Sequence, residues 1–136
     1  MKIGVVIALY NGRQFLREQL NSLLRQTLLP DIIVCCDDGS TDGTMDRLQE
    51  YVRACGHEEL FLCVQNEKNL GYAQNFYHAL DLCDADILFL CDQDDVWHAD
   101  KIKKMTAAFA RDRQIQLLAC GHDLIDGRGE QTSSLR

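Results

Sequence analysis

Short apolar runs alternate with helical patterns along most of this 136-residue chain. The apolar runs cover residues 3–9, 32–36, 60–64, 87–91 and 115–120. Apolar residues recur at the spacing of an amphipathic helix between them, over residues 13–27, 45–55, 73–80 and 102–109. Strands that are apolar on both faces and alternate with helices are typical of βαβ units. The sequence therefore predicts an α/β fold with a mostly parallel sheet and helices on both faces.

The length and net charge of the chain limit its organisation and its partners. A chain of 136 residues has room for one core, so we expect a single domain over 1–136, with residues 127–136 as a flexible tail. The net charge of −7 argues against a protein that binds nucleic acid by neutralising phosphates with basic side chains. We expect no nucleic-acid partner.

The seven cysteines indicate a reducing compartment. They are scattered, contain no CxxC pair, and several lie inside apolar runs such as "IIVCCD" and "LFLCD". This pattern is typical of small buried hydrophobic residues and not of a disulfide framework or a zinc site. The N-terminal apolar run is too short for a signal peptide or a membrane span. We therefore expect a cytoplasmic protein.

Polar clusters follow four of the expected strands directly: "YN", "DDGSTD", "NEKN" and "DQDD". In parallel sheets, ligands bind beyond the carboxyl ends of the strands. The sequence therefore predicts a ligand site at this edge of the sheet, which is the layout of many enzymes.

Asp37 and Asp38 end the second expected strand. Ser40, Thr41 or Asp42 could cap the following helix, but helix capping does not account for two adjacent acids at a strand end. An acid at this position is suited to bind a ribose hydroxyl or a base N–H, so Asp38 is a candidate ligand-binding residue. A calcium loop starting at Asp38 is excluded, because its twelfth position would be Gln49 instead of glutamate.

In the stretch "ILFLCDQDDVW", an apolar strand is followed directly by three carboxylates, Asp92, Asp94 and Asp95. Like charges this close raise one another's pKa unless a cation relieves the repulsion. Asp92 and Asp94 alternate along the chain and could offer two oxygens to one hard cation. Mg²⁺ or Mn²⁺ would keep open positions for phosphate oxygens, so we expect a metal that bridges to a diphosphate.

Aromatic and histidine side chains near these clusters are weaker signals. Tyr10 could stack on a base or simply pack against the sheet, and Trp97 is best interpreted as a wall of the pocket or the core. His98 and His122 are candidate ligands for the metal or a phosphate, although a single histidine is weak evidence.

Four spaced motifs together resemble family 2 glycosyltransferases of the GT-A fold. The motifs are "VVIALYNG", "LLRQTLLPDIIVCCDDGSTDGT", "NEKNLGYAQNF" and "LFLCDQDDVWHADKI", and they cover nearly the whole chain. The wording "CDQDDVW" with a later "GHDLID" is most similar to bacterial rhamnosyltransferase-like members, which build cell-surface polysaccharide, often from dTDP-rhamnose.

The resemblance implies a Rossmann-like GT-A fold, shortened here, and a role for each motif. By position, Tyr10 packs on the nucleobase and Asp38 accepts its ring N–H. "DQD" corresponds to the DxD motif, in which Asp92 lies near the ribose or metal-bound water and Asp94 coordinates Mn²⁺ or Mg²⁺. The other residues implied in donor binding are Asn11, Gly39, Asn69, Gly71, Asn75 and Gln93.

The resemblance also implies what the chain lacks. Inverting members deprotonate the acceptor with an acid from the later half of the domain, so we expect the catalytic base beyond residue 136; Asp123 and Asp126 come too early. We therefore expect nucleotide binding without turnover. The implied acceptor is a glycan or a lipid-linked sugar, with the full-length protein at the inner face of the membrane. Apolar surface left by a missing half predicts self-association.

Three alternatives stay open. A haloacid-dehalogenase-type phosphatase would use Asp92 as nucleophile and Asp94 as acid and base, although its motif normally opens the fold. A noncatalytic pseudo-transferase would keep the sheet and the nucleotide site without the reaction. A receiver domain would explain "CCDD" but would leave "DQDD" without a role.

Overall fold

The computed structural model describes residues 1–116, 118, 122–125 and 131–135. Their contacts divide the chain into two compact units, Met1–Thr106 and Ala107–Arg136, where the sequence predicts one domain. The elements of the first unit, in chain order, are β1 (Ile3–Leu9), α1 (Arg13–Leu24), β2 (Ile32–Asp37), α2 (Thr44–Ala54), the 3₁₀ turn Glu58–Leu60, β3 (Phe61–Gln65), α3 (Tyr72–Leu82), β4 (Ile87–Asp92) and the start of α4 (Lys101–Arg111).

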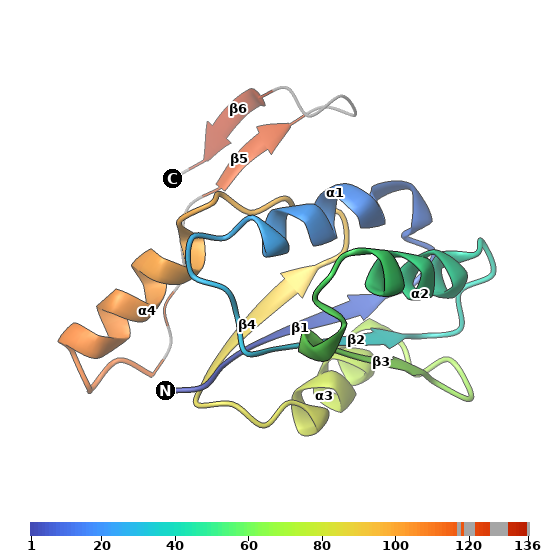
Figure 1. The fold of residues 1–136 in the computed structure, drawn as a ribbon, viewed down its shortest axis with the longest axis horizontal. Helices are drawn as coiled ribbons and strands as arrows, with labels where there is room; N and C mark the ends of the chain where they lie inside the picture. The colour runs from blue at the N-terminus through green and yellow to red at the C-terminus, as the bar shows by residue number, and fades with distance from the viewer. Residues whose placement is uncertain (117, 119–121, 126–130, 136) are drawn as a thin grey trace. The chain divides into compact units, whose positions relative to one another are not determined.

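The first unit is built on a four-stranded parallel sheet in the order β3-β2-β1-β4. Helices α1 and α2 lie on one face of this sheet and α3 lies on the other (Figure 1). This arrangement confirms the predicted α/β architecture with helices on both faces. The predicted strands and helices of this unit all form, and their ends differ from the predicted ends by a few residues at most.

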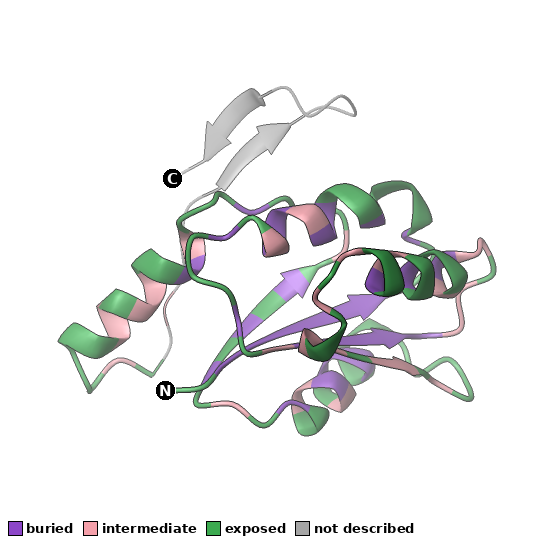
Figure 2. Cartoon of the chain, in the orientation of Figure 1, coloured by how far each residue is buried: buried purple, intermediate pink, exposed green. Residues whose placement is uncertain are grey.

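Burial explains why the strands read as continuous apolar runs. Every residue of β1 is buried, as are the last five residues of β2, because helices cover both faces of these central strands (Figure 2). On the α3 face, the core joins Val6, Val34 and Phe76 with neighbouring apolar side chains. The edge strand β4 alternates instead: Leu88 and Leu90 are exposed while Ile87, Phe89 and Cys91 are buried.

Helix α2 begins differently from the prediction. Its N-cap is Gly43, with a left-handed φ of 89°, and not Ser40, Thr41 or Asp42. Asp42 still contributes, because its Oδ1 atom accepts a hydrogen bond from the Thr44 backbone N–H at 3.0 Å. At the other end, Gly56 follows the last residues of the helix with a φ of 80°, as expected for a glycine that ends a helix.

The described cysteines are all free, as predicted. Cys35, Cys36, Cys83 and Cys91 are buried, and two others are half-buried. None of the described helices is both long and apolar enough to cross a bilayer.

The second unit contains an antiparallel pair of strands, β5 (His122–Ile125) and β6 (Gln131–Leu135). The strand predicted over 115–120 falls partly on residues 117, 119 and 120, which lie outside the described residues, and Ile115, Gln116 and Leu118 are not in a strand. The predicted flexible tail covers residues 127–130 and 136, which also lie outside them, and the strand β6.

Candidate functional site

The carboxyl ends of the four parallel strands meet at one edge of the sheet. Leu9 pairs with Asp37, Asp37 pairs with Gln65, and Ala8 pairs with Asp92, so the strands end at nearly the same level. This register brings the four polar clusters predicted from the sequence to one edge. The candidate site is built from the loops that leave it.

The loop after β1 contacts the loops on both sides. The Tyr10 backbone N–H donates to Gln93 Oε1 at 2.8 Å, which joins two of the predicted residues. Asn11 has a left-handed φ of 51°; its N–H donates to Ser40 Oγ, and its Oδ1 atom accepts from the Thr41 N–H, both at 2.8 Å. The Tyr10 side chain is 47% exposed, so it is accessible for stacking on a base.

Asp37 shapes the turn after β2. Its fully buried carboxylate accepts hydrogen bonds from the Gly39 N–H at 3.2 Å, the Ser40 N–H at 3.0 Å and the Ser40 hydroxyl at 2.5 Å. Gly39 takes a φ of 87°, which L side chains rarely adopt. Asp37 therefore has a structural role, and Gly39 reverses the chain at the site.

Asp38 is the centre of a second network. It is 3% exposed, and its Oδ1 atom accepts from Asn66 Nδ2 at 3.0 Å and from the Leu70 N–H at 2.7 Å. Its Oδ2 atom accepts from the Gly71 N–H at 2.9 Å. Asn69 Nδ2 donates to the Asp38 carbonyl at 3.0 Å. Asp38, Asn69 and Gly71 are thus brought together, and Asp38 holds the loop that enters α3.

Asn75 is buried in the hydrogen-bond network between α3 and β2. It is 2% exposed; its Nδ2 atom donates to the Cys36 carbonyl at 3.0 Å, and its Oδ1 atom accepts from Asn66 Nδ2 at 2.8 Å. Its amide ties α3 to β2, and a contact with a donor stays a prediction. Asn66, which bridges Asp38 and Asn75, belongs to the predicted cluster "NEKN" but was not singled out as a site residue.

The acidic segment after β4 forms a tight turn. The Asp95 N–H donates to the Asp92 carbonyl at 3.2 Å, and Asp94 takes a left-handed φ of 71°. From α1, the buried Gln19 side chain donates through Nε2 to the same carbonyl at 2.5 Å. Gln19 was also not predicted, although a glutamine on the apolar face of a helix is a signal of a buried polar contact.

Tyr72 joins α3 to this turn, because its hydroxyl donates a hydrogen bond to Asp92 Oδ1. This hydrogen bond is the main reason why the pKa of Tyr72 rises to about 12. Tyr72 was not among the predicted site residues, although it lies within the motif "NEKNLGYAQNF". It places a neutral donor against the Asp92 carboxylate.

The turn concentrates negative charge. The side chains of Asp92, Asp94 and Asp95 are all exposed. Partial desolvation, followed by the charges of Asp92 and Asp94, raises the pKa of Asp95, while Lys101 acts in the opposite direction. No group of three His, Cys, Asp or Glu side chains in the described part of the chain is placed to hold a metal ion. Because β4 ends at Asp92 and Asp94 has a left-handed φ of 71°, the strand alternation expected to point these two side chains the same way does not continue, and a cation shared by Asp92 and Asp94 stays a prediction.

Trp97 belongs to the core, in agreement with the sequence. It is 6% exposed, its ring centroid is 5.7 Å from that of Phe89, and Lys101 Nζ lies 4.1 Å from the indole centroid. The His98 carbonyl accepts a hydrogen bond from Gln26 Nε2 at 2.6 Å, and a ligand role for the His98 side chain stays a prediction. The His122 side chain lies outside the described part of the chain.

Comparison with known proteins gives a family and two informative relatives. The model of glycosyl transferase family 2 matches residues 4–133. A dTDP-rhamnosyl transferase of Shigella flexneri, RfbG, is 34% identical over 101 residues, which are 71% of this chain and 34% of that protein. Chondroitin synthase of Escherichia coli is 30% identical over 133 residues, or 97% of this chain and 19% of that protein.

Solved structures confirm the predicted GT-A fold. TarS 1–349 of S. aureus in complex with UDP-GlcNAc is 27% identical, with a TM-score of 0.72 over 82% of this chain and 32% of that one. A mannosyltransferase of Pyrobaculum calidifontis, in complex with GDP-Man and Mn²⁺, has a TM-score of 0.72 at 24% identity, over 80% of this chain and 32% of that one, and shows the fold alone. The chain spans about a third of each of these two structures and about a third of RfbG.

Proposed function

The chain belongs to glycosyl transferase family 2, and we propose that the sheet edge described above is the donor half-site of a metal-dependent sugar transferase. The observation that carries this proposal is that the Tyr10 loop, the Asp38 network and the Asp92–Gln93–Asp94 turn all leave one edge of the sheet. The ligand is a nucleoside diphosphate sugar. The TarS complexes with UDP and UDP-GlcNAc support this class of ligand.

Different side chains would contact different parts of the donor. Tyr10 offers an exposed ring for stacking on the base. Asp38 Oδ2 accepts only one hydrogen bond from the described residues, so it keeps capacity for a base N–H. Asp92 and Asp94 would hold Mn²⁺ or Mg²⁺, and Tyr72 orients the Asp92 carboxylate. When bound, the cation supplies positive charge that offsets the charge on a diphosphate leaving group.

We propose dTDP-rhamnose as the donor and a cell-surface polysaccharide or another glycan, free or lipid-linked, as the acceptor. The similarity to RfbG supports this donor. Among the described residues we assign no base for transfer with inversion, so the proposal concerns binding of the donor. Family membership favours the transferase over the phosphatase alternative. A pseudo-transferase that binds nucleotide without catalysis is separated from an enzyme by an assay of sugar transfer.

The test is a calorimetric titration with dTDP, UDP and GDP, each with and without Mn²⁺, on the unchanged chain and on Asp94→Ala. Asp84→Ala is the matched control, because Asp84 is also exposed but precedes β4 at the opposite edge of the sheet. We expect Mn²⁺-dependent binding of one nucleotide that Asp94→Ala abolishes and Asp84→Ala retains. Nucleotide affinity that does not depend on Mn²⁺, or that is unchanged in Asp94→Ala, would contradict the proposed metal site. Absence of binding to all three nucleotides would contradict the donor site itself.

A further inference from the structure

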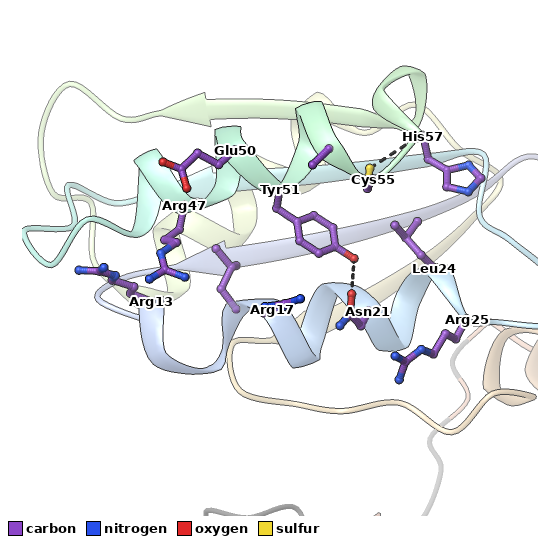
Figure 3. Close-up of a pocket in the computed structure, with 12 residues that line it drawn as sticks. Arg13, Arg17, Asn21, Leu24, Arg25, Arg47, Glu50, Tyr51, Cys55 and His57 are labelled. Atoms are coloured by element: carbon purple, nitrogen blue, oxygen red, sulfur yellow. Dashed lines mark hydrogen bonds between the residues drawn. The ribbon is translucent and has the colours of Figure 1, made fainter.

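A groove of about 510 Å³ lies between α1 and α2, and arginines dominate its lining. Figure 3 shows Arg13 and Arg47 at one end, Arg17 near the middle and Arg25 at the other end. The positive charges are therefore spread along the groove. Arg17 and Arg25 belong to or directly follow α1, and Arg47 belongs to α2.

These guanidinium groups are largely unneutralised. Glu50 is the one carboxylate among the lining residues, in a chain whose net charge is −7. Within the described residues, the guanidinium groups of Arg17, Arg25 and Arg47 make no ion pair or hydrogen bond, and that of Arg13 donates to the Asp42 carbonyl at 3.3 Å. All four arginines are exposed, and guanidinium groups bind carboxylate and phosphate with two parallel hydrogen bonds, so this row is available to an external anion.

Neutral groups complete the groove. The Tyr51 hydroxyl donates to Asn21 Oδ1 at 2.8 Å, which leaves Asn21 Nδ2 available as a donor. Burial and the charge of Cys55 raise the pKa of Tyr51, whereas the positive charges of Arg25 and Arg17 lower it. Both guanidinium groups are therefore close enough to Tyr51 for their charges to be felt there. Leu16, Leu24 and Ala54 add apolar lining.

We propose that the groove between α1 and α2 binds a linear chain that carries several phosphate groups, at a site separate from the donor site. Arginine forks match phosphate oxygens in geometry and charge. Several guanidinium groups spaced along the groove fit several anionic groups better than a single one. The concave shape fits a chain, whereas a flat lipid surface would leave the groove unfilled.

Tripolyphosphate, titrated in EDTA so that no divalent cation can attach it to the acidic turn, is the first probe. The arginine Nε–H signals in ¹H–¹⁵N NMR spectra identify the residues that respond. We expect Arg17→Glu and Arg47→Glu each to weaken binding by roughly tenfold or more. Arg53→Glu is the matched control, because Arg53 lies on α2 outside the groove and the substitution changes the charge equally. An equal loss in Arg53→Glu, or no binding at millimolar probe, would overturn the proposal.

Three further measurements identify the kind of phosphate ligand and distinguish this groove from the donor site. Inorganic phosphate that binds as tightly as tripolyphosphate or a glycerol phosphate hexamer would overturn the chain-binding proposal in favour of a single-anion site. Cosedimentation with phosphatidylglycerol vesicles, without binding to the soluble probes, would overturn it in favour of a membrane surface. Nucleotide titrations with Mn²⁺ should be unchanged in Arg17→Glu and Arg47→Glu, so either site can fail without the other.

Discussion

The Tyr72 hydroxyl at the start of α3 donates a hydrogen bond to the Asp92 carboxylate at the end of β4. This hydrogen bond connects α3, which begins just after the loop bound by Asp38, with the acidic turn that we propose as the metal site. Loss of a partner that orients a metal ligand typically lowers metal affinity by about 10–100-fold.

Tyr72→Phe removes this hydrogen bond and keeps the ring. We expect metal-dependent nucleotide affinity to fall by about tenfold, because the Asp92 carboxylate loses the donor that orients it. Tyr77→Phe is the control: Tyr77 is also exposed on α3, at 60%, and donates no side-chain hydrogen bond within the described residues. Calorimetry on the two variants checks the prediction, and equal affinities would contradict it.

Asp38→Asn replaces a buried acceptor with a group that also donates. The carboxylate accepts hydrogen bonds from Asn66, Leu70 and Gly71, so an amide would face at least one of these donors with its own N–H. We expect the free energy of unfolding to fall by about 2–3 kcal/mol. Urea denaturation measures it, with the exposed Asp81→Asn as control. A loss below that of the control would show that the network does not stabilise the fold.

Gly12→Ala tests the contact between the loops after β1 and β4. A Cβ atom at Gly12 would lie 2.7 Å from Gln93 Oε1, the atom that accepts the Tyr10 N–H, so Gln93 would have to move. We expect a loss of about 1 kcal/mol in the free energy of unfolding. In a Gln93→Ala background the same substitution should cost less, because the clash is gone. An equal cost in both backgrounds would exclude the coupling.

Thiol reactivity should depend on pH in a residue-specific way. A hydrogen bond from the Cys35 thiol lowers the pKa of the half-buried Cys63, and the same contact raises the pKa of Cys35. Burial raises the pKa of Cys36 to about 11 and that of Cys91 to about 12. Because the thiolate is the reactive form, iodoacetamide at pH 7.5 should label Cys63 before Cys36 or Cys91.

Mass spectrometry locates the label. Cys35→Ala should slow labelling of Cys63 several-fold, because loss of the donor raises the pKa of Cys63 and leaves less thiolate. Faster labelling of Cys63 in this variant would contradict the assigned hydrogen bond.

The edge strand β4 should promote self-association. Leu88 and Leu90 are 42% and 58% exposed, side by side on one face of a strand that pairs only with β1 among the described strands. We expect Leu90→Lys to lower the associated fraction in sedimentation and light scattering at high concentration. Leu28→Lys, at a residue 39% exposed in the loop after α1, is the control. A monodisperse monomer of the unchanged chain would contradict the prediction.

The sequence by itself determined the α/β class, the parallel sheet and the edge at which the polar clusters collect. These follow from local patterns: apolar runs of β1, β2 and β4, helical spacing between them, and acids such as Asp38 and Asp92 directly after strands. Such patterns could be read because neighbouring residues already define which faces a strand or a helix must bury.

Only the tertiary structure decided which side chains meet at that edge. Gln19 reaches the carbonyl of Asp92, 73 residues away, and Tyr72 reaches the carboxylate of the same residue, 20 residues away. The tertiary structure also decided that the Asp38 carboxylate binds the backbone of the loop around Gly71. These contacts depend on the strand order β3-β2-β1-β4 and on how each helix packs on the sheet, because hydrogen bonds between distant segments form only once the sheet has brought their ends together.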